Sequence, residues 1–371
     1  MRNRHVRLFV WAIALLGLVS AACAGGEETT ATDAQTTATT SAEADSSPRE
    51  LRLLAWEGYD DPDWVEPFES QFNVEVSTTY VGSVDEMFAK LQTQGSNFDL
   101  VFPDSATLSR YIDAGLLQEL DTSQIPNMEN MLQFWQEQTY YRVGDDVYAI
   151  PFTGGDTPII YNTSAIDTPE ATWAALWDPQ YAGQIAMLDD SNNSVVIAAL
   201  YLGLPDPFNL SDSEFEQVQD ALREQRELVR RYYAGEDEGL SLFASMEATI
   251  GVQIEPFMVG ELNEESEFVF ASLYPVEGAL AWVDNAAIPA GAENADIAHA
   301  YINYALTADV QGQLVSKYQF LPIVDVSQTA DAEAAERVAS LEDVIADLVL
   351  LETPEDTERR VQMWNEIRAG S

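Results

Sequence analysis

Short apolar segments that favour strands alternate with segments of helical period from residue 51 onward. Strand-like runs occupy residues 51–56, 73–80 and 98–103, and helix-like runs occupy residues 64–72, 84–94 and 105–114. Strands joined by helices pair in parallel, and a parallel sheet needs helices over both of its faces. The alternation therefore predicts an α/β fold built on mainly parallel sheets.

The same alternation resumes after the apolar run Tyr148–Phe152. A further strand and more helices then follow, and no internal repeat is visible. With 371 residues, the chain is long enough for more than one domain. We therefore expect two α/β units. In this second part, strands are expected at 159–161, 184–188, 249–253, 268–274 and 281–289, and helices at 211–234 and from 297 to the end.

The first 48 residues predict export. Three arginines precede an apolar run at residues 8–22, which is too short for a comfortable membrane span and is typical of a signal peptide over residues 1–22. Cys23 follows Ser-Ala-Ala, which resembles a bacterial lipobox, so Cys23 is the expected site of lipidation. The alternative is a cysteine that is removed with the signal. Residues 24–48 lack bulky apolar side chains and predict a disordered tether, with the lipidated Cys23 anchoring the exported protein to the membrane.

Charge and residue counts exclude several classes of function. The 63 acidic residues against 17 basic ones give a formal net charge of -46, which repels nucleic acid and anionic lipid. Cys23 is the only cysteine, so the chain has no intrachain disulfide, and with His5 and His299 as its only histidines it has no Cys/His zinc site. The Ala-His299-Ala setting favours a packed or surface helix position. We expect no metal, no cofactor and no enzymatic activity.

Several short motifs, in the same order along most of the chain, resemble the periplasmic spermidine/putrescine-binding proteins, which are the solute-binding components of bacterial ABC importers. They include Leu-Ala-Trp-Glu-Gly-Tyr at 54–59, Phe-Asp-Leu-Val-Phe-Pro at 98–103 and Trp-Val-Asp-Asn-Ala-Ala-Ile-Pro at 282–289. The other matching segments are 68–72, 86–91, 114–117, 148–152, 175–183, 188–190 and 302–304.

The resemblance implies a two-lobe, periplasmic-binding-protein-like fold of type II with two crossover strands. Residues 49–153 and 287–371 are expected to form lobe one, and residues 154–286 to form lobe two. The expected protein is a periplasmic or cell-surface monomer that delivers a small cationic ligand of the polyamine type to a membrane permease. Ligands of such folds bind in the cleft between the lobes.

A polyamine needs carboxylates or aromatic faces for its ammonium groups and apolar walls for its methylenes. Trp282 and Asp284 are two residues apart on an expected strand, so both side chains point to one face. The resemblance places ligand contacts at both positions, and also at Trp56, Tyr59 and Asp190. Packing in the core could instead explain Trp56 and a turn could explain Tyr59, while Asp190 could cap a helix and leave the ligand to Asp189.

The chain departs from the family pattern at several positions. Asp104 stands where the family has serine, either as an added carboxylate in the cleft or as a helix cap, and Ala106 replaces a tyrosine. Asn193 replaces a glutamate, Glu255 lies beside the position of a family tryptophan, and Phe320 replaces a tyrosine, and we expect these three residues to contact the ligand as well. Asp156, in Thr-Gly-Gly-Asp at 153–156, is a further expected cation contact, and the two glycines there predict a hinge or a close approach of the backbone.

Two other kinds of function remain open from the sequence. The same fold could bind another amine, an amino-acid derivative or a compatible solute. A secreted hydrolase that works with a pair of carboxylates is the alternative of another class, although no carboxylate pair stands in a recognisable catalytic motif. A calcium-binding role is disfavoured because the Asp-x-Asp-x-Asp-Gly loop is absent.

Overall fold

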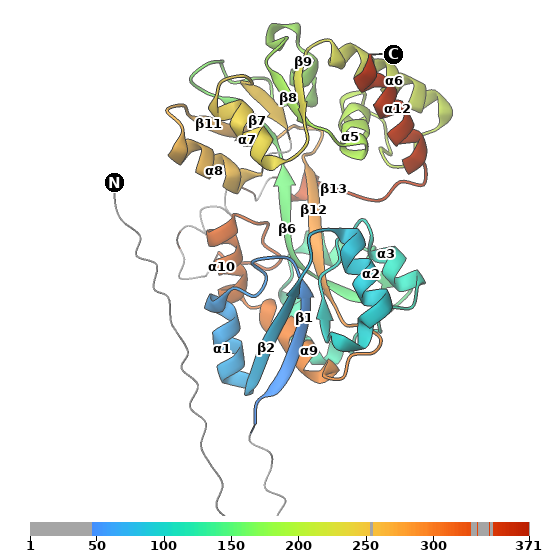
Figure 1. The fold of residues 1–371 in the computed structure, drawn as a ribbon, viewed down its shortest axis with the longest axis vertical. Helices are drawn as coiled ribbons and strands as arrows, with labels where there is room; N and C mark the ends of the chain where they lie inside the picture. Colours follow the sequence, from blue (N-terminus) through green and yellow to red (C-terminus); the bar gives the residue numbers. More distant parts are fainter. Residues whose placement is uncertain (1–46, 253–254, 328–331, 333–340, 342–343, 371) are drawn as a thin grey trace, which may run out of the picture. The chain divides into compact units, whose positions relative to one another are not determined.

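The computed structural model describes residues 47–252, 255–327, 332, 341 and 344–370. The expected signal peptide, Cys23 and the tether lie outside the described residues. The described part contains two large sheets and the two-stranded pair of β4 (Arg142–Val143) and β5 (Asp146–Val147). Each large sheet is packed in its own hydrophobic core, and we refer to these two parts as lobe one and lobe two (Figure 1).

Lobe one is built on a sheet in which β2, β1 and β3 pair in parallel, with β12 antiparallel beside β3. Leu53 and Leu54 on β1 are fully buried, as expected for a strand covered on both faces. The elements before the first crossover are β1 (Arg49–Ala55), α1 (Pro62–Phe72), β2 (Val74–Tyr80), α2 (Val84–Gln94), β3 (Leu100–Val101), α3 (Leu108–Asp113), α4 (Gln133–Glu137), β4 (Arg142–Val143) and β5 (Asp146–Val147).

Lobe two has a second sheet, in the order β11-β7-β10-β8-β9. Its helix α5 is apolar on all sides and runs through the core, with Val195 to Ala199 fully buried. Its elements are β7 (Ile159–Asn162), β8 (Ile185–Leu188), α5 (Ser191–Tyr201), α6 (Asp212–Arg226), β9 (Val229–Tyr233), α7 (Glu236–Ala244), β10 (Ile250–Val252), α8 (Pro256–Glu265) and β11 (Phe270–Leu273).

Strands β6 (Ala149–Thr157) and β12 (Leu280–Ala287) connect the two lobes as an antiparallel pair (Figure 1). Their register runs from Leu280 opposite Thr157 to Ala287 opposite Ala149. One irregularity lies between Asp284 and Asn285, where β6 inserts the extra residue Phe152. The expected two-lobe α/β fold with its crossover strands is confirmed.

The end of the chain differs from the expected division. After β12 the chain returns to lobe one through α9 (Ala295–Ala305) and α10 (Ala308–Tyr318) and reaches β13 (Val349–Leu350) beside β12. Helix α12 (Thr357–Ala369) then buries Met363, Trp364 and Ile367 in the core of lobe two, against α5 and α6. The assignment of all of 287–371 to lobe one is therefore wrong for this last helix, whose apolar side chains are covered by lobe two.

The long helix expected over 211–234 is also shorter than the periodicity predicted. Helix α6 begins with a capping box between Ser211 and Glu214 and ends at Arg226. The next residues, Val-Arg-Arg-Tyr-Tyr, form β9 beside β8. Branched and aromatic side chains favour a strand, and pairing with β8 outweighs the continuation of the helical pattern at Leu228.

Candidate ligand-binding site

Strand β12 carries Trp282 and Asp284 through the crossover between the lobes. The two side chains share one face of the strand, as the sequence predicted. Asp284 is only 6% exposed, and Trp282 is half-buried. The partners of these two residues define two adjoining groups of side chains.

The first group surrounds Trp282. Its indole Nε1 donates a hydrogen bond of 2.8 Å to Glu255 Oε1 from the start of α8 in lobe two. The Phe320 ring, from the chain after α10 in lobe one, packs edge-on against the indole at 5.4 Å between centroids and 81° between planes. Trp282 therefore joins side chains from both lobes, and these are three of the residues expected to bind the ligand.

The second group surrounds Asp284. The Tyr59 hydroxyl donates a 2.6 Å hydrogen bond to Asp284 Oδ2. Asp104 lies beside Asp284 through an isolated antiparallel bridge. Burial raises the pKa of Asp284 to about 8, the hydrogen bond from Tyr59 opposes this rise, and the negative charge of Asp104 adds to it. Asp284 is thus a largely neutral acid at pH 7 in the absence of a cation.

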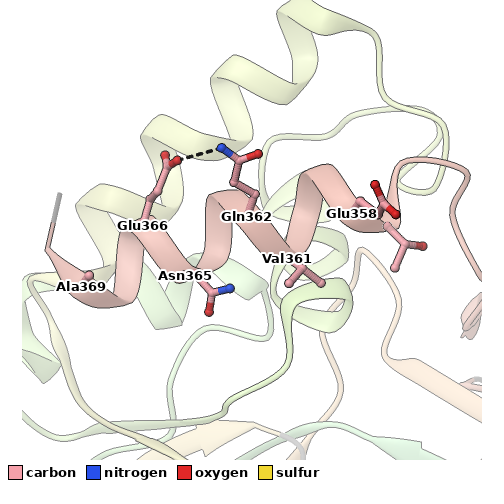
Figure 2. A pocket seen from close by; sticks show the side chains of 7 residues that line it. Glu358, Val361, Gln362, Asn365, Glu366 and Ala369 are labelled. Atoms are coloured by element: carbon pink, nitrogen blue, oxygen red, sulfur yellow. Dashed lines mark hydrogen bonds between the residues drawn. The ribbon is translucent and has the colours of Figure 1, made fainter.

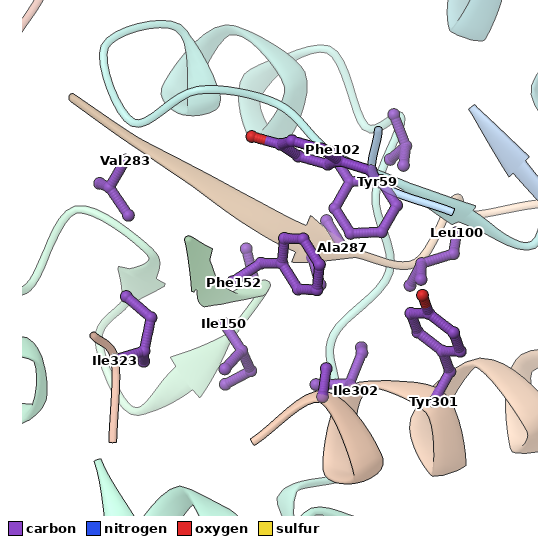
Figure 3. Close-up of a cluster of buried hydrophobic side chains, with 14 of the residues drawn as sticks. Tyr59, Leu100, Phe102, Ile150, Phe152, Val283, Ala287, Tyr301, Ile302 and Ile323 are labelled. Carbon is purple, nitrogen blue, oxygen red and sulfur yellow. The ribbon is translucent and has the colours of Figure 1, made fainter. Parts of the chain in front are cut away.

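Tyr59 belongs both to the core and to this group. Its ring lies with Phe102 at 5.4 Å and Phe152 at 5.2 Å, and Figure 3 shows the three rings gathered among the buried side chains of lobe one. Burial, followed by the charge of Asp284, raises the pKa of Tyr59 well above its ordinary value. The hydroxyl therefore stays protonated and acts as a donor to Asp284.

Asp104 does not cap α3, whose N-cap is Thr107, but binds within the turn that precedes the helix. Its carboxylate accepts hydrogen bonds from the backbone N–H of Thr107 at 3.0 Å and from the Thr107 hydroxyl. Its charge also acts on Asp284, so this local role is compatible with a place beside the ligand site. Trp56 is half-buried against the core of lobe one and donates from Nε1 to the Phe102 carbonyl at 3.1 Å.

The lobe-two residues Asp190 and Asn193 lie at the start of α5. Asp190 caps the helix by accepting a 2.7 Å hydrogen bond from the Asn193 N–H. Within the described residues, neither is joined to Trp282 or Asp284 by a hydrogen bond or ring contact. Asp189 binds Trp364 and Arg368 of α12 instead. Asp156 is fully buried in β6 opposite Ala281.

Sequence reasoning missed several side chains at the site. Thr153 lies opposite Asp284 in the crossover pair, and its buried hydroxyl has no hydrogen-bond partner among the described residues. Tyr140 donates to Asn285 Oδ1 at 2.9 Å. The register of two strands more than a hundred residues apart identifies Thr153, and no local pattern in the sequence carries that information.

A surface hollow lies away from these residues. It has a volume of about 640 Å³ and runs along the outer face of α12, where Gln362 donates to Glu366 at 3.3 Å (Figure 2). Its lining includes none of the expected site residues. Across the ranges that the structure describes, no three His, Cys, Asp or Glu side chains are grouped so as to hold a metal ion, and no helix has the length and apolarity to span a bilayer.

Two α/β lobes, paired crossover strands and side chains converging from both lobes define a two-lobed binding protein of the periplasmic type. The family model of bacterial extracellular solute-binding proteins matches residues 63–340, and the chain belongs to this family. The family is one of solute-binding proteins, not of enzymes, and its members act outside the cytoplasm.

Similar proteins agree with this assignment. The chain is 28% identical over 293 residues to spermidine/putrescine-binding periplasmic protein 1 of Haemophilus influenzae, covering 78% of this chain and 79% of that protein. It is 27% identical over 278 residues to the spermidine/putrescine-binding periplasmic protein of Escherichia coli, covering 71% and 74%. The fold matches the crystal structure of the spermidine/putrescine ABC transporter substrate-binding protein of Streptococcus pneumoniae with a TM-score of 0.77 and 22% identity, over 87% of this chain and 99% of the other.

Proposed function

We propose that this protein is the solute-binding component of an ABC importer and captures a polyamine of the spermidine/putrescine type for delivery to a membrane permease. The observation that carries the proposal is the buried Asp284 carboxyl beside Trp282. Among the described residues, no lysine or arginine forms an ion pair with Asp284 or Asp104. A ligand ammonium would supply the missing positive charge.

The surrounding side chains suit the rest of such a ligand. Trp282 and Phe320 offer apolar ring surfaces to the methylene chain, and Glu255 brings a second carboxylate from lobe two. A ligand that contacts Asp284 and Glu255 together stabilises the arrangement in which the lobes are close, because only then are both acids within its reach. The related proteins whose names include spermidine or putrescine support this ligand class.

Direct calorimetry with spermidine and putrescine tests the function. Saturable binding of either ligand, with no heat from a neutral diol of equal length, is the expected result. An amino-acid derivative, a monoamine and a compatible solute complete the panel. The polyamine assignment is overturned if one of these binds while both polyamines remain silent.

Binding should also depend on pH. A ligand ammonium favours the ionised form of Asp284, whose pKa in the unliganded protein is about 8. The affinity is therefore expected to rise with pH from 6 to 8, by up to about tenfold per pH unit, with release of a proton on binding. Calorimetry in buffers of different ionisation enthalpy measures that proton. A flat affinity over this range in the wild type, equal to that of Asp284→Asn, contradicts the role given to Asp284.

The membrane attachment through Cys23 belongs to the same proposal. Lipidation of Cys23 would hold a monomeric binding protein near its permease, with residues 24–48 as the tether. Detergent phase partition of the expressed protein tests it. The wild type is expected in the detergent phase and Cys23→Ser in the aqueous phase, and equal partition of the two excludes the anchor.

A further inference from the structure

We propose that Gly155 is a specificity-determining position, which fixes the orientation of the Trp282 indole before the ligand arrives. The inference rests on the proposed function, since it concerns the wall of the same ligand site. Gly155 has no side chain to offer a ligand, and it acts through Trp282, its partner in the strand pair. It is therefore a positioning residue.

The steric evidence is direct. Gly155 lies opposite Trp282 in the antiparallel β6–β12 pair, so the indole lies against the glycine backbone. A Cβ atom added at Gly155 would lie 2.5 Å from Cε2 and 2.6 Å from Cζ2 and Nε1 of the indole. These separations are far below van der Waals contact, so the ring cannot keep its place above any other residue.

The neighbouring glycine has a different constraint. A Cβ atom at Gly154 would meet the backbone carbonyl of Trp282 at 2.6 Å. Substitution there would disturb the strand pair itself, whereas substitution at Gly155 meets a side chain. Of the two glycines in this hinge-like segment, Gly155 is thus the one that sets the position of the ring.

A second contact of the Trp282 ring comes from Phe320. Phe320 meets the indole edge-on and in turn stacks on Tyr318 at 5.4 Å, with 17° between planes. The Tyr318 hydroxyl donates a hydrogen bond of 3.1 Å to Asp61, which is the N-cap residue of α1. Asp61 also accepts a hydrogen bond from Lys317 of α10. The rings of Trp282, Phe320 and Tyr318 form an aromatic wall, which is connected to α1 of lobe one through the hydrogen bond between Tyr318 and Asp61.

Glu255 makes the ring position matter for the ligand. The indole N–H is committed to Glu255 Oε1 at 2.8 Å, which orients a carboxylate of lobe two at the edge of the wall. A displaced ring loses this hydrogen bond, and with it one of the contacts that orient the Glu255 carboxylate toward the wall. Ligands that differ in the spacing of their ammonium groups should respond unequally, because the indole face changes its position relative to Asp284.

The test compares Gly155→Ala with Gly82→Ala in full-length protein. Gly82 lies before α2, and an added Cβ there has only Glu86 Oε2 within 4 Å, at 3.8 Å. The probes are spermidine and putrescine by calorimetry, and the ¹⁹F resonance of Trp282 in protein labelled with 5-fluorotryptophan, assigned by its loss in Trp282→Phe. Gly155→Ala is expected to shift that resonance in the unliganded protein, to weaken binding about tenfold and to change the ratio of the two affinities. Gly82→Ala should do none of these.

A double-mutant cycle separates positioning from a general loss of structure. In the Trp282→Phe background, Gly155→Ala should change the affinity by less than about twofold, because the clashing ring atoms are gone. If Gly155→Ala lowers affinity equally in both backgrounds, or leaves the Trp282 resonance unmoved, the inference is wrong.

If Gly155→Ala does not fold, Tyr318→Phe provides a second test, because it removes the hydrogen bond to Asp61 that holds the ring stacked on Phe320. It is expected to shift the same resonance, and an unmoved resonance opposes the inference. If the wild type binds no polyamine, the proposed function is wrong. The shift of the Trp282 resonance in the unliganded protein still tests the positioning role of Gly155, because it does not depend on the ligand.

Discussion

Asp284→Asn is expected to abolish polyamine binding at micromolar concentrations while leaving the unliganded protein folded and more stable than the wild type at pH 7. Asparagine has the shape of the protonated acid, and burial already keeps the Asp284 carboxyl largely neutral there. Only the complex requires the negative charge. Loss of one partner of a buried ion pair typically costs about 2–5 kcal/mol, which corresponds to a roughly 30-fold to several-thousand-fold weaker affinity.

The difference in folding stability between Asp284→Asn and the wild type should grow as the pH rises. The folded-state pKa of Asp284 is raised to about 8, above its ordinary value of 3.8, so the folded wild type holds a proton that the unfolded chain releases. Its stability therefore falls as pH rises from about 4 to 8, whereas this contribution is absent in Asp284→Asn. Thermal unfolding at pH 5 and 8.5 measures the difference.

The control for Asp284→Asn is Asp85→Asn, which removes one negative charge from an exposed carboxylate paired with Arg110. It should bind the ligand as the wild type does. Equal loss of affinity in the two variants would mean that long-range charge attracts the ligand and that Asp284 has no special part. Unchanged affinity in Asp284→Asn would remove Asp284 from the site.

Arg360→Ala should destabilise lobe two by about 3–5 kcal/mol, the largest stability effect that we expect from a single substitution outside the site. The Arg360 side chain is fully buried at the junction of α12 with lobe two. It donates to Asp356 at 2.7 Å, to Asn192 at 2.8 Å, and to the carbonyls of Pro207 and Phe208 at 3.0 and 2.9 Å. Removing it leaves a carboxylate and two carbonyls without this donor, in addition to a cavity.

Arg359→Ala is the matched control, one position away on the same helix. Its side chain is 43% exposed, pairs with Asp212 and lies over the Phe215 ring at 3.8 Å. Exposed pairs of this kind contribute up to about 1 kcal/mol. Urea unfolding followed by tyrosine and tryptophan emission compares the variants. A loss in Arg360→Ala no greater than that in Arg359→Ala would show that α12 does not depend on the buried guanidinium.

The sequence predicted the architecture because the signals involved are local. The alternation of strand and helix periods between residues 51 and 114 needs no partner to be recognised, and β1, α1, β2 and α2 lie within two residues of their expected bounds. Two-residue spacing also sufficed to place Trp282 and Asp284 on one face. Such features depend only on residues that are close together in the sequence.

Long-range contacts could not be predicted in this way. The support of Trp282 by Gly155 follows from the register of strands separated by 127 residues, and α12 finds its place in lobe two through the buried Arg360 and Trp364. Asp190 illustrates the remaining ambiguity, because a helix cap and an ammonium acceptor require the same residue type. The structure shows the cap, and the role of Asp190 toward the ligand stays a prediction.

The position of α12 has a practical consequence. The first described strand, β1, belongs to lobe one, whereas the last helix is fixed to lobe two. A donor fluorophore ahead of Arg49 and an acceptor after α12 would therefore be attached to different lobes. Energy transfer between them would measure the closing of the lobes that the proposed function requires, and the same pair of labels would make the chain a sensor of the proposed ligand.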